Sequence, residues 1–176
     1  MLHTDPSQLA TGNGGGGALV SGFEAGLLGG VAMAACMAAS AVLAGMDPLT
    51  PLAPMGDAFV GPLPREPGAA RLAYGFALHL IFSGFIGALF TAVFPRDFPP
   101  KNALVVGIGL SWTVMALMTS IVLPAYNPSL RSEMSELGGS WVLAHAAYGV
   151  TVGFFGQWLR QRRRVRAPAT VRTRAA

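Results

Sequence analysis

Two histidines within long apolar stretches are the residues of this chain best suited to chemistry. His79 begins the run His-Leu-Ile-Phe-Ser-Gly-Phe-Ile-Gly and His145 begins His-Ala-Ala-Tyr-Gly-Val-Thr-Val-Gly, so a glycine follows each histidine by eight residues. An ionisable side chain inside a lipid bilayer is costly, and it therefore marks a functional candidate. Imidazole nitrogen is also a good ligand for haem iron or for the magnesium of chlorophyll.

Three uses of His79 and His145 are open. A neutral histidine can donate one hydrogen bond between helices, and we favour this structural use. Two histidines at a shared depth could instead be axial ligands of one haem or chlorophyll, but a small, glycine-rich helical unit leaves limited room for a macrocycle. A proton relay would need nearby carboxylates, and the apolar stretches carry no Asp or Glu in their middle. We therefore favour a chain without a cofactor, with the two histidines as the candidate ligands if one binds.

The sequence shows no catalytic constellation. Its single cysteine, Cys36, excludes a disulfide within the chain and a Cys-cluster metal site. The glycine-rich segment 12–17 lacks the Lys-Ser or Lys-Thr pair of a phosphate-binding loop. Methionine pairs such as Met33 and Met37 could bind copper through their thioethers, but such pairs more often serve packing. We therefore expect neither enzyme activity nor a bound metal ion.

Composition assigns the chain to the membrane proteins. Of its 176 residues, 52% are hydrophobic and 11% are charged, whereas a soluble domain averages about 25% charged residues. Four apolar segments each approach the ~20 residues that a helix needs to cross a bilayer. They cover residues 22–46, 71–94, 103–123 and 140–159. Because a spanning segment must satisfy its own backbone hydrogen bonds, we predict an all-α integral membrane protein with four transmembrane helices.

Two terminal segments flank this predicted domain of residues 22–159. Residues 1–21 are rich in glycine and predict a flexible lead-in, and residues 160–176 form an Arg-rich tail. Basic residues favour the cytoplasmic side of a membrane. Arg96 and Lys101, between the second and third segments, must share a side with the tail because two crossings separate them. We therefore expect both termini to be cytoplasmic, in a multi-pass protein of the bacterial inner membrane.

The four segments resemble two similar helical hairpins. The second and fourth share the spacing from histidine to glycine. The first and third match more weakly, through Met33-Ala-Ala-Cys-Met beside Val114-Met-Ala-Leu-Met. Repeats related by an axis along the membrane normal occur in membrane proteins. The pattern favours two repeated hairpins, although matches this short also arise by chance among Gly/Ala-rich helices.

Small residues recur every four positions along several segments. Such ladders let two helices approach closely. They could serve packing within the chain or docking of another subunit, and the sequence leaves both open. The first segment has more small-residue surface than one neighbouring helix needs, so it is the candidate docking helix. The ladder residues are Gly22, Gly26, Gly30, Ala34, Ala38, Ser83, Gly87, Gly149 and Gly153.

Charged residues at the segment ends have simpler explanations. Glu24 lies near the start of the first segment, where a carboxylate suits the positive end of a helix. The arginines of the tail are expected to contact anionic lipid or a partner subunit, because each is worth about 1 kcal/mol near an anionic surface. They lack the interleaved aromatic residues and folded basic domain of a nucleic-acid-binding protein, so we expect no nucleic-acid partner. These residues are Arg160, Arg162, Arg163, Arg164 and Arg166.

With these motifs the chain resembles a group of uncharacterised small four-helix proteins of the bacterial inner membrane. The shared features are a Gly/Ala/Met-rich first helix, a histidine followed by small residues in the second, and His-x-x-Tyr-Gly-x-x-x-Gly in the fourth. Here the last pattern runs from His145 to Gly153. The resemblance covers residues 22–159. It implies a four-helix membrane fold and an association with respiratory or other electron-transfer complexes, but it implies no chemistry.

The function expected from these observations is non-catalytic. We expect an accessory or structural subunit of a larger membrane complex, respiratory or photosynthetic in kind, whose partners are lipids and other subunits. The alternative is a haem- or chlorophyll-binding electron-transfer protein that uses His79 and His145. A third candidate, a small transporter or channel, rests on the hairpin repeat.

Overall fold

Helices make up every element of the part of the chain that the structure describes. In the computed structural model, the described residues are 14–52, 69–94, 98–122, 125 and 138–166. The elements are α1 (Gly14–Leu43), the 3-10 turn η2 (Thr50–Leu52), α3 (Ala69–Val93), α4 (Pro100–Leu117), the π-helical turn η3 (Met118–Val122) and α7 (Gly138–Arg166). The all-α prediction is confirmed for these residues.

Three of the helices are long and apolar enough to cross a membrane. These stretches are Gly16–Leu43, Leu72–Val93 and Pro100–Val122. They correspond to the first three predicted segments, and they make this a membrane-type helical protein. The helix α7 is less apolar because it carries His145, Gln157 and a run of arginines. Several of its polar side chains, namely His145, Gln157 and Arg160, are buried against the other helices.

The first helix begins before its predicted start, and the last helix continues past its predicted end. α1 begins at Gly14 rather than Gly22, although glycine is a poor helix former. A tertiary contact outweighs this low propensity, because the carbonyl of Ala18 accepts a hydrogen bond from Thr91 Oγ1 at 2.8 Å. The predicted flexible lead-in of residues 1–21 was therefore too long. Likewise, α7 continues to Arg166, so the first part of the predicted tail is helical.

A glycine ends α1 three residues before the predicted boundary at Met46. Gly45 has a φ of +73°, the left-handed conformation that glycine adopts without a steric penalty. Its N–H donates to the carbonyl of Val42 at 3.0 Å, and the N–H of Met46 donates to Ala41 at 2.8 Å. This pair of bonds is a Schellman motif, which satisfies the last helical carbonyls and turns the chain away.

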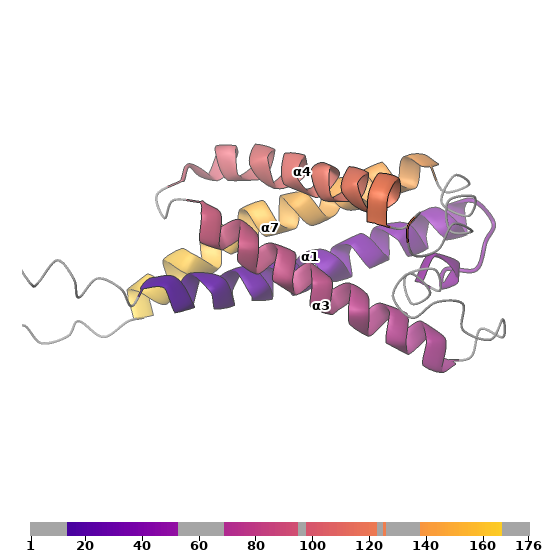
Figure 1. Cartoon of the computed structure of the whole chain (residues 1–176), viewed down its shortest axis with the longest axis horizontal. Helices are drawn as coiled ribbons and strands as arrows, with labels where there is room; N and C mark the ends of the chain where they lie inside the picture. Colours follow the sequence, from indigo (N-terminus) through magenta and orange to yellow (C-terminus); the bar gives the residue numbers. More distant parts are fainter. Residues whose placement is uncertain (1–13, 53–68, 95–97, 123–124, 126–137, 167–176) are drawn as a thin grey trace, which may run out of the picture.

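The helices pack in the order α3, α1, α7, α4 (Figure 1). α1 and α7 form the central pair, while α3 lies on α1 and α4 lies on α7. The start of α1, the end of α3, the start of α4 and the end of α7 all lie at one end of the molecule, shown on the left of Figure 1. Because this end holds the N-terminus of α1, we call it the αN1 end. The hairpins predicted from the sequence are therefore α1 with α3 and α4 with α7.

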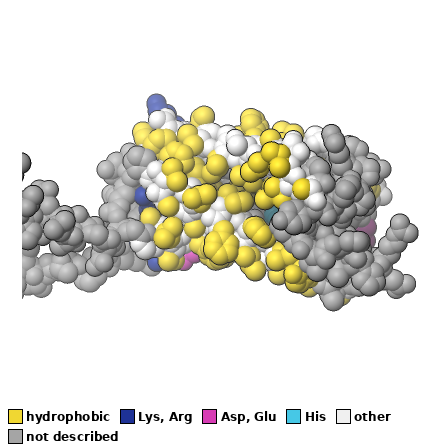
Figure 2. All heavy atoms as spheres, viewed as in Figure 1, with side chains coloured by type: hydrophobic (Ala, Val, Ile, Leu, Met, Phe, Trp, Pro, Cys, Tyr) yellow, Lys and Arg dark blue, Asp and Glu magenta, His cyan; other side chains and the backbone are white. Residues whose placement is uncertain are grey.

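The core joins three of the four helices. Its buried residues are Met33, Met37, Phe90, Ala144, Tyr148 and Val152. The methionines of α1 thus serve packing, the use that the sequence favoured over copper. The outer surface of the helices is also apolar: Figure 2 shows hydrophobic side chains over the middle of the visible face, with Lys and Arg toward the αN1 end. A surface of this kind suits a lipid environment.

Candidate functional site

His79 joins α3 to α1. Its Nε2 lies 3.0 Å from the carbonyl oxygen of Gly30, so a ring N–H at this position donates a hydrogen bond across the helix pair. Gly30 allows this approach because a Cβ there would meet the side chain of Ser83 at 2.8 Å. The contact is of the structural kind that the sequence favoured for this histidine.

His145 is held mainly by its own helix. Its Nδ1 lies 2.8 Å from the carbonyl oxygen of Trp141, one turn earlier in α7. The imidazole also stacks on the Trp141 ring, with the centroids 5.9 Å apart. The backbone carbonyl of His145 accepts a 2.7 Å hydrogen bond from Ser111 Oγ on α4. The contacts with Trp141 therefore orient the imidazole of His145 within α7. The hydrogen bond from Ser111 to the backbone carbonyl of His145 links α7 to α4.

The two histidines lie on different helices, α3 and α7. Each ring is hydrogen-bonded to a different backbone carbonyl, that of Gly30 for His79 and that of Trp141 for His145. Within the described residues, no group of three or more His, Cys, Asp or Glu side chains could hold a metal ion. The structure brings the pair to one region of the molecule without building a metal centre there.

Tyr148 makes a buried polar contact between two helices. In the sequence this residue stood out only as part of the His-x-x-Tyr-Gly motif. Its hydroxyl donates a 2.6 Å hydrogen bond to the carbonyl of Ser83, linking α7 to α3. The ring lies over Gly29 of α1, where a Cβ would come within 2.8 Å of Tyr148 Cδ2. The available signal was a tyrosine immediately before a small-residue ladder, but its partner helix could not be predicted from the sequence.

The small-residue ladder of α1 is used inside the chain. A Cβ at Gly22 would overlap the backbone of Gly87, and one at Gly26 would overlap the carbonyl of Ser83. Ala34 is also buried, and Ala38 is half-buried. α1 lies between two neighbours, α3 and α7, rather than the single neighbour on which the docking expectation depended. Packing within the chain therefore accounts for this ladder.

The second hairpin has its own ladder, part of which the sequence analysis missed. Gly149 packs against the backbone of Gly107, and Gly153 packs against that of Ala103. Ala103, Gly107 and Ser111 are the buried residues of α4. Their spacing of four positions was visible in the sequence, and it is the signal that would have identified the face of α4 that contacts α7.

Arginines at the end of α7 are engaged with other helices or with aromatic rings. Arg160 is 8% exposed, and both of its terminal nitrogens donate to the carbonyl of Phe94, just after α3, at 3.4 Å. Arg162 lies over the Trp158 ring, 3.8 Å from its centroid. The side chains of Arg164 and Arg166 lie outside the described part of the structure.

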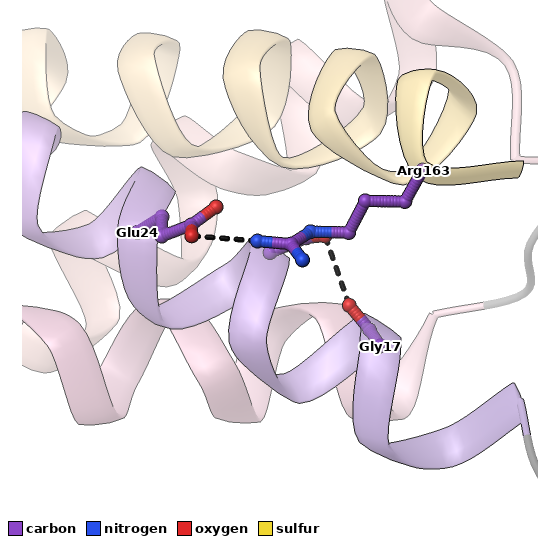
Figure 3. A network of polar contacts seen from close by, with 4 residues as sticks. Gly17, Glu24 and Arg163 are labelled. Carbon is purple, nitrogen blue, oxygen red and sulfur yellow. Dashed lines mark hydrogen bonds and ion pairs between the residues drawn. The ribbon is translucent and has the colours of Figure 1, made fainter. Parts of the chain in front are cut away.

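Arg163 forms an ion pair with Glu24 of α1. Its Nη2 lies 2.6 Å from Glu24 Oε1, and Figure 3 shows the side chain reaching from α7 to α1 near the backbone of Gly17. The two side chains are 45% and 42% exposed. Glu24 was expected to be an interfacial helix-end residue, and the structure adds this cationic partner from the far end of the chain.

Comparison of the sequence with family profiles identifies the family to which this helical chain belongs. The profile of a family of unknown function, DUF6789, matches residues 17–167, which span all four long helices. The chain belongs to the DUF6789 family. The match extends at both ends beyond the 22–159 covered by the resemblance, as do α1 and α7 themselves. No curated protein and no solved structure matches the chain.

Membership of DUF6789 identifies an uncharacterised family, as the motifs implied, and it supplies no activity. Few side chains in the described part of the DUF6789 chain could take part in chemistry. Its described carboxylates, Glu24 and Asp47, are engaged with Arg163 and with the N–H of Leu49. The described site is thus a set of interhelical polar contacts between closely packed helices.

Proposed function

We propose that the chain crosses the bacterial inner membrane four times and serves as a non-catalytic accessory subunit of a larger complex. The electron-transfer character of that complex is what the family resemblance implies. One observation carries the docking part of the proposal: a line of small and polar residues runs along the outside of α4 and η3, beside the bulky exposed side chains of Val105, Trp112 and Leu117.

The fourth crossing is supported by the packing of α7. This helix runs antiparallel to α1, from Arg163 beside Glu24 at the αN1 end to Ala144, which shares the core cluster with Met37 of α1. A helix that packs along a spanning helix in this way supports a shared depth in the bilayer. At 1.5 Å per residue, the 29 residues of α7 extend about 43 Å, which exceeds the ~30 Å hydrocarbon core.

The proposed docking face lies on α4 and continues into η3. It is formed by exposed residues that are small or polar, namely Gly109, Thr113 and Ala116 of α4 and Ser120 of η3. A Cβ at Gly109 would meet no atom within 4 Å, whereas Gly107 on the same helix packs against α7. Small residues in a membrane helix let a second backbone approach closely.

The outward face of α3 provides the comparison. It is bulky and apolar, with Phe85 62% exposed, Leu89 60% and Val93 68%. Such side chains fit well among lipid tails. The contrast favours a protein helix against α4 and lipid against α3.

The test is extraction of the tagged chain from native membranes in a mild detergent, followed by size-exclusion chromatography. We expect the wild type to elute with a partner at fixed stoichiometry. Gly109→Leu should release the chain from that assembly, because the new side chain occupies the approach surface without touching this protein. Ala92→Leu, at an exposed position of α3, is the matched control and should leave the assembly intact. Elution of the wild type as a free monomer would refute the proposal.

The haem or chlorophyll alternative is less well supported. Ligation by His79 through Nε2 would require loss of its bond to Gly30 and separation of a helix pair that meets through glycine. The visible absorbance spectrum of the purified chain tests this alternative directly. An absorbance band that His79→Ala or His145→Ala abolishes would favour it over the accessory-subunit proposal.

A further inference from the structure

A buried amide at the αN1 end has no partner. Gln157 of α7 is 3% exposed, and within the described structure its Nε2 has no hydrogen-bond acceptor. Buried polar groups are almost always paired, so a buried unpaired donor calls for an explanation. A ligand that supplies an acceptor is one such explanation.

The packing of α7 against α4 shows what Gln157 faces. Gly149 lies against Gly107, and one turn later Gly153 lies against Ala103. One further turn along the same face of α7 is Gln157, and one further turn back along α4 is Pro99. From this register we infer that the amide faces the first turn of α4.

Two backbone N–H groups of α4 precede its first helical hydrogen bond. Its N-cap is Pro99 and its first residue is Pro100, and no side chain caps the helix there. The first helical hydrogen bond runs from the N–H of Ala103 to the carbonyl of Pro99 at 2.9 Å. The N–H groups of Lys101 and Asn102 precede that bond, so they lack a helical acceptor one turn back. Such a helix start attracts anions through its free N–H groups and its dipole.

Cationic side chains surround this point. Arg160 lies three residues after Gln157 and is 8% exposed, and Lys101 is exposed on α4. Glu24, a described carboxylate of the same end, is paired with Arg163 (Figure 3). Arg160, which also donates to the carbonyl of Phe94, and Lys101 place positive charge at this end of the described structure, and a charged donor suits an anionic acceptor.

We propose that Gln157 and the first turn of α4 bind the phosphate group of an anionic phospholipid from the cytoplasmic leaflet. The lipid is favoured over free phosphate because the site lies at the ends of apolar helices, beside the exposed Val105 of α4. Basic sites between helices on the cytoplasmic side commonly bind anionic headgroups. The inference rests on the proposed membrane placement of the four helices, but not on the partner complex.

The test measures thermal unfolding of the purified full chain in a neutral detergent. The additions are phosphatidylglycerol, phosphatidylcholine or inorganic phosphate at equal concentration. Native mass spectrometry counts bound lipid in parallel. The variant is Gln157→Leu, and the matched control is Gln161→Leu, an exposed glutamine one turn further along α7.

For the wild type, we expect phosphatidylglycerol to bind about tenfold more tightly than phosphatidylcholine, the factor expected when a charge-assisted hydrogen bond is present. Gln157→Leu should unfold at a higher temperature than the wild type without lipid, because it removes an unpaired buried donor. It should also lose the preference for phosphatidylglycerol. If Gln157 had only a structural role, its replacement would not both raise the unfolding temperature without lipid and abolish the preference for phosphatidylglycerol. Gln161→Leu should behave like the wild type in both respects.

Three results would overturn the proposal. Equal binding of the two lipids by the wild type would show no anion preference. Retained preference in Gln157→Leu would place the lipid elsewhere. Stabilisation by inorganic phosphate equal to that by phosphatidylglycerol would assign the site to a free ion instead of a lipid. None of these results depends on whether a partner complex exists, so failure here and failure of the accessory-subunit proposal can be told apart.

Discussion

Individual glycines serve in this chain as contact surfaces rather than as flexible joints. Gly26 on α1 is an example, because the missing side chain leaves room for the backbone of Ser83. In lipid there is little hydrophobic driving force between helices, so close packing of backbones becomes the main source of stability. Whether a glycine is essential therefore depends on what lies opposite it.

Gly26→Ala should destabilise the protein by about 1–3 kcal/mol, because the added methyl group forces α1 and α3 apart. Gly109→Ala is the matched control, since the space beside it is open and alanine is the better helix former. We expect the control to be neutral or slightly stabilising. Thermal unfolding in detergent measures both variants, and equal effects would contradict the assigned contact.

Tyr148 combines a hydrogen bond with packing, and two substitutions separate these contributions. Tyr148→Phe removes only the bond to Ser83, which should cost about 0.6 kcal/mol and at most about 1.7 kcal/mol in a membrane protein. Tyr148→Ala also opens a cavity over Gly29 and should cost about 3–5 kcal/mol. Denaturant titration provides the two values. If Tyr148→Phe were as damaging as Tyr148→Ala, the hydroxyl would have a role beyond this bond.

At the scale of elements, the two helices within each hairpin contact each other through small residues, and the register of these contacts is the same in both hairpins. Gly26 opposite Ser83 corresponds to Gly107 opposite Gly149, and Gly22 opposite Gly87 corresponds to Ala103 opposite Gly153. The same alignment pairs His79 with His145 and Met33 with Val114, as in the sequence comparison. The hairpins differ in their second contacts, because α1 also packs on α7 whereas α4 leaves a face open.

The ion pair between Glu24 and Arg163 links the central helices α1 and α7 at the αN1 end. Both side chains are nearly half exposed, so solvent screens much of their attraction. A double-mutant cycle with Glu24→Gln and Arg163→Gln should yield a coupling of about 0.2–1 kcal/mol. The coupling should shrink at 1 M salt, where the screening length is only about 3 Å. A large, salt-independent coupling would mean that the pair is desolvated in the membrane-bound protein.

For the whole molecule, the proposed topology predicts which residues are reachable from each side. In a Cys36→Ala background, single cysteines replace the exposed residues Gly16, Leu49, Gly138 and Gln161. An impermeant maleimide added to intact cells should label Leu49→Cys and Gly138→Cys. Gly16→Cys and Gln161→Cys should react only after permeabilisation. Labelling of Gly16→Cys and Gln161→Cys from opposite sides would require an odd number of crossings.

Composition and apolar length were enough to predict the class of protein and the approximate extent of its helices. Apolar length is a local property, because each spanning helix must satisfy its own backbone hydrogen bonds. For this reason three apolar segments predicted α1, α3 and α4 with η3 closely. The helix ends were less predictable: α1 extends to Gly14 through the bond from Thr91, a residue distant in sequence.

Only the tertiary structure decided what the small and polar residues do. Gly30 with His79, and Gly29 with Tyr148, are pairs of residues far apart in the chain, and a ladder of small residues does not specify its partner. The same holds for Gln157, whose type predicts a surface position but whose side chain is buried. Local composition sets where a helix forms, whereas the helix that packs against each face depends on the arrangement of all four.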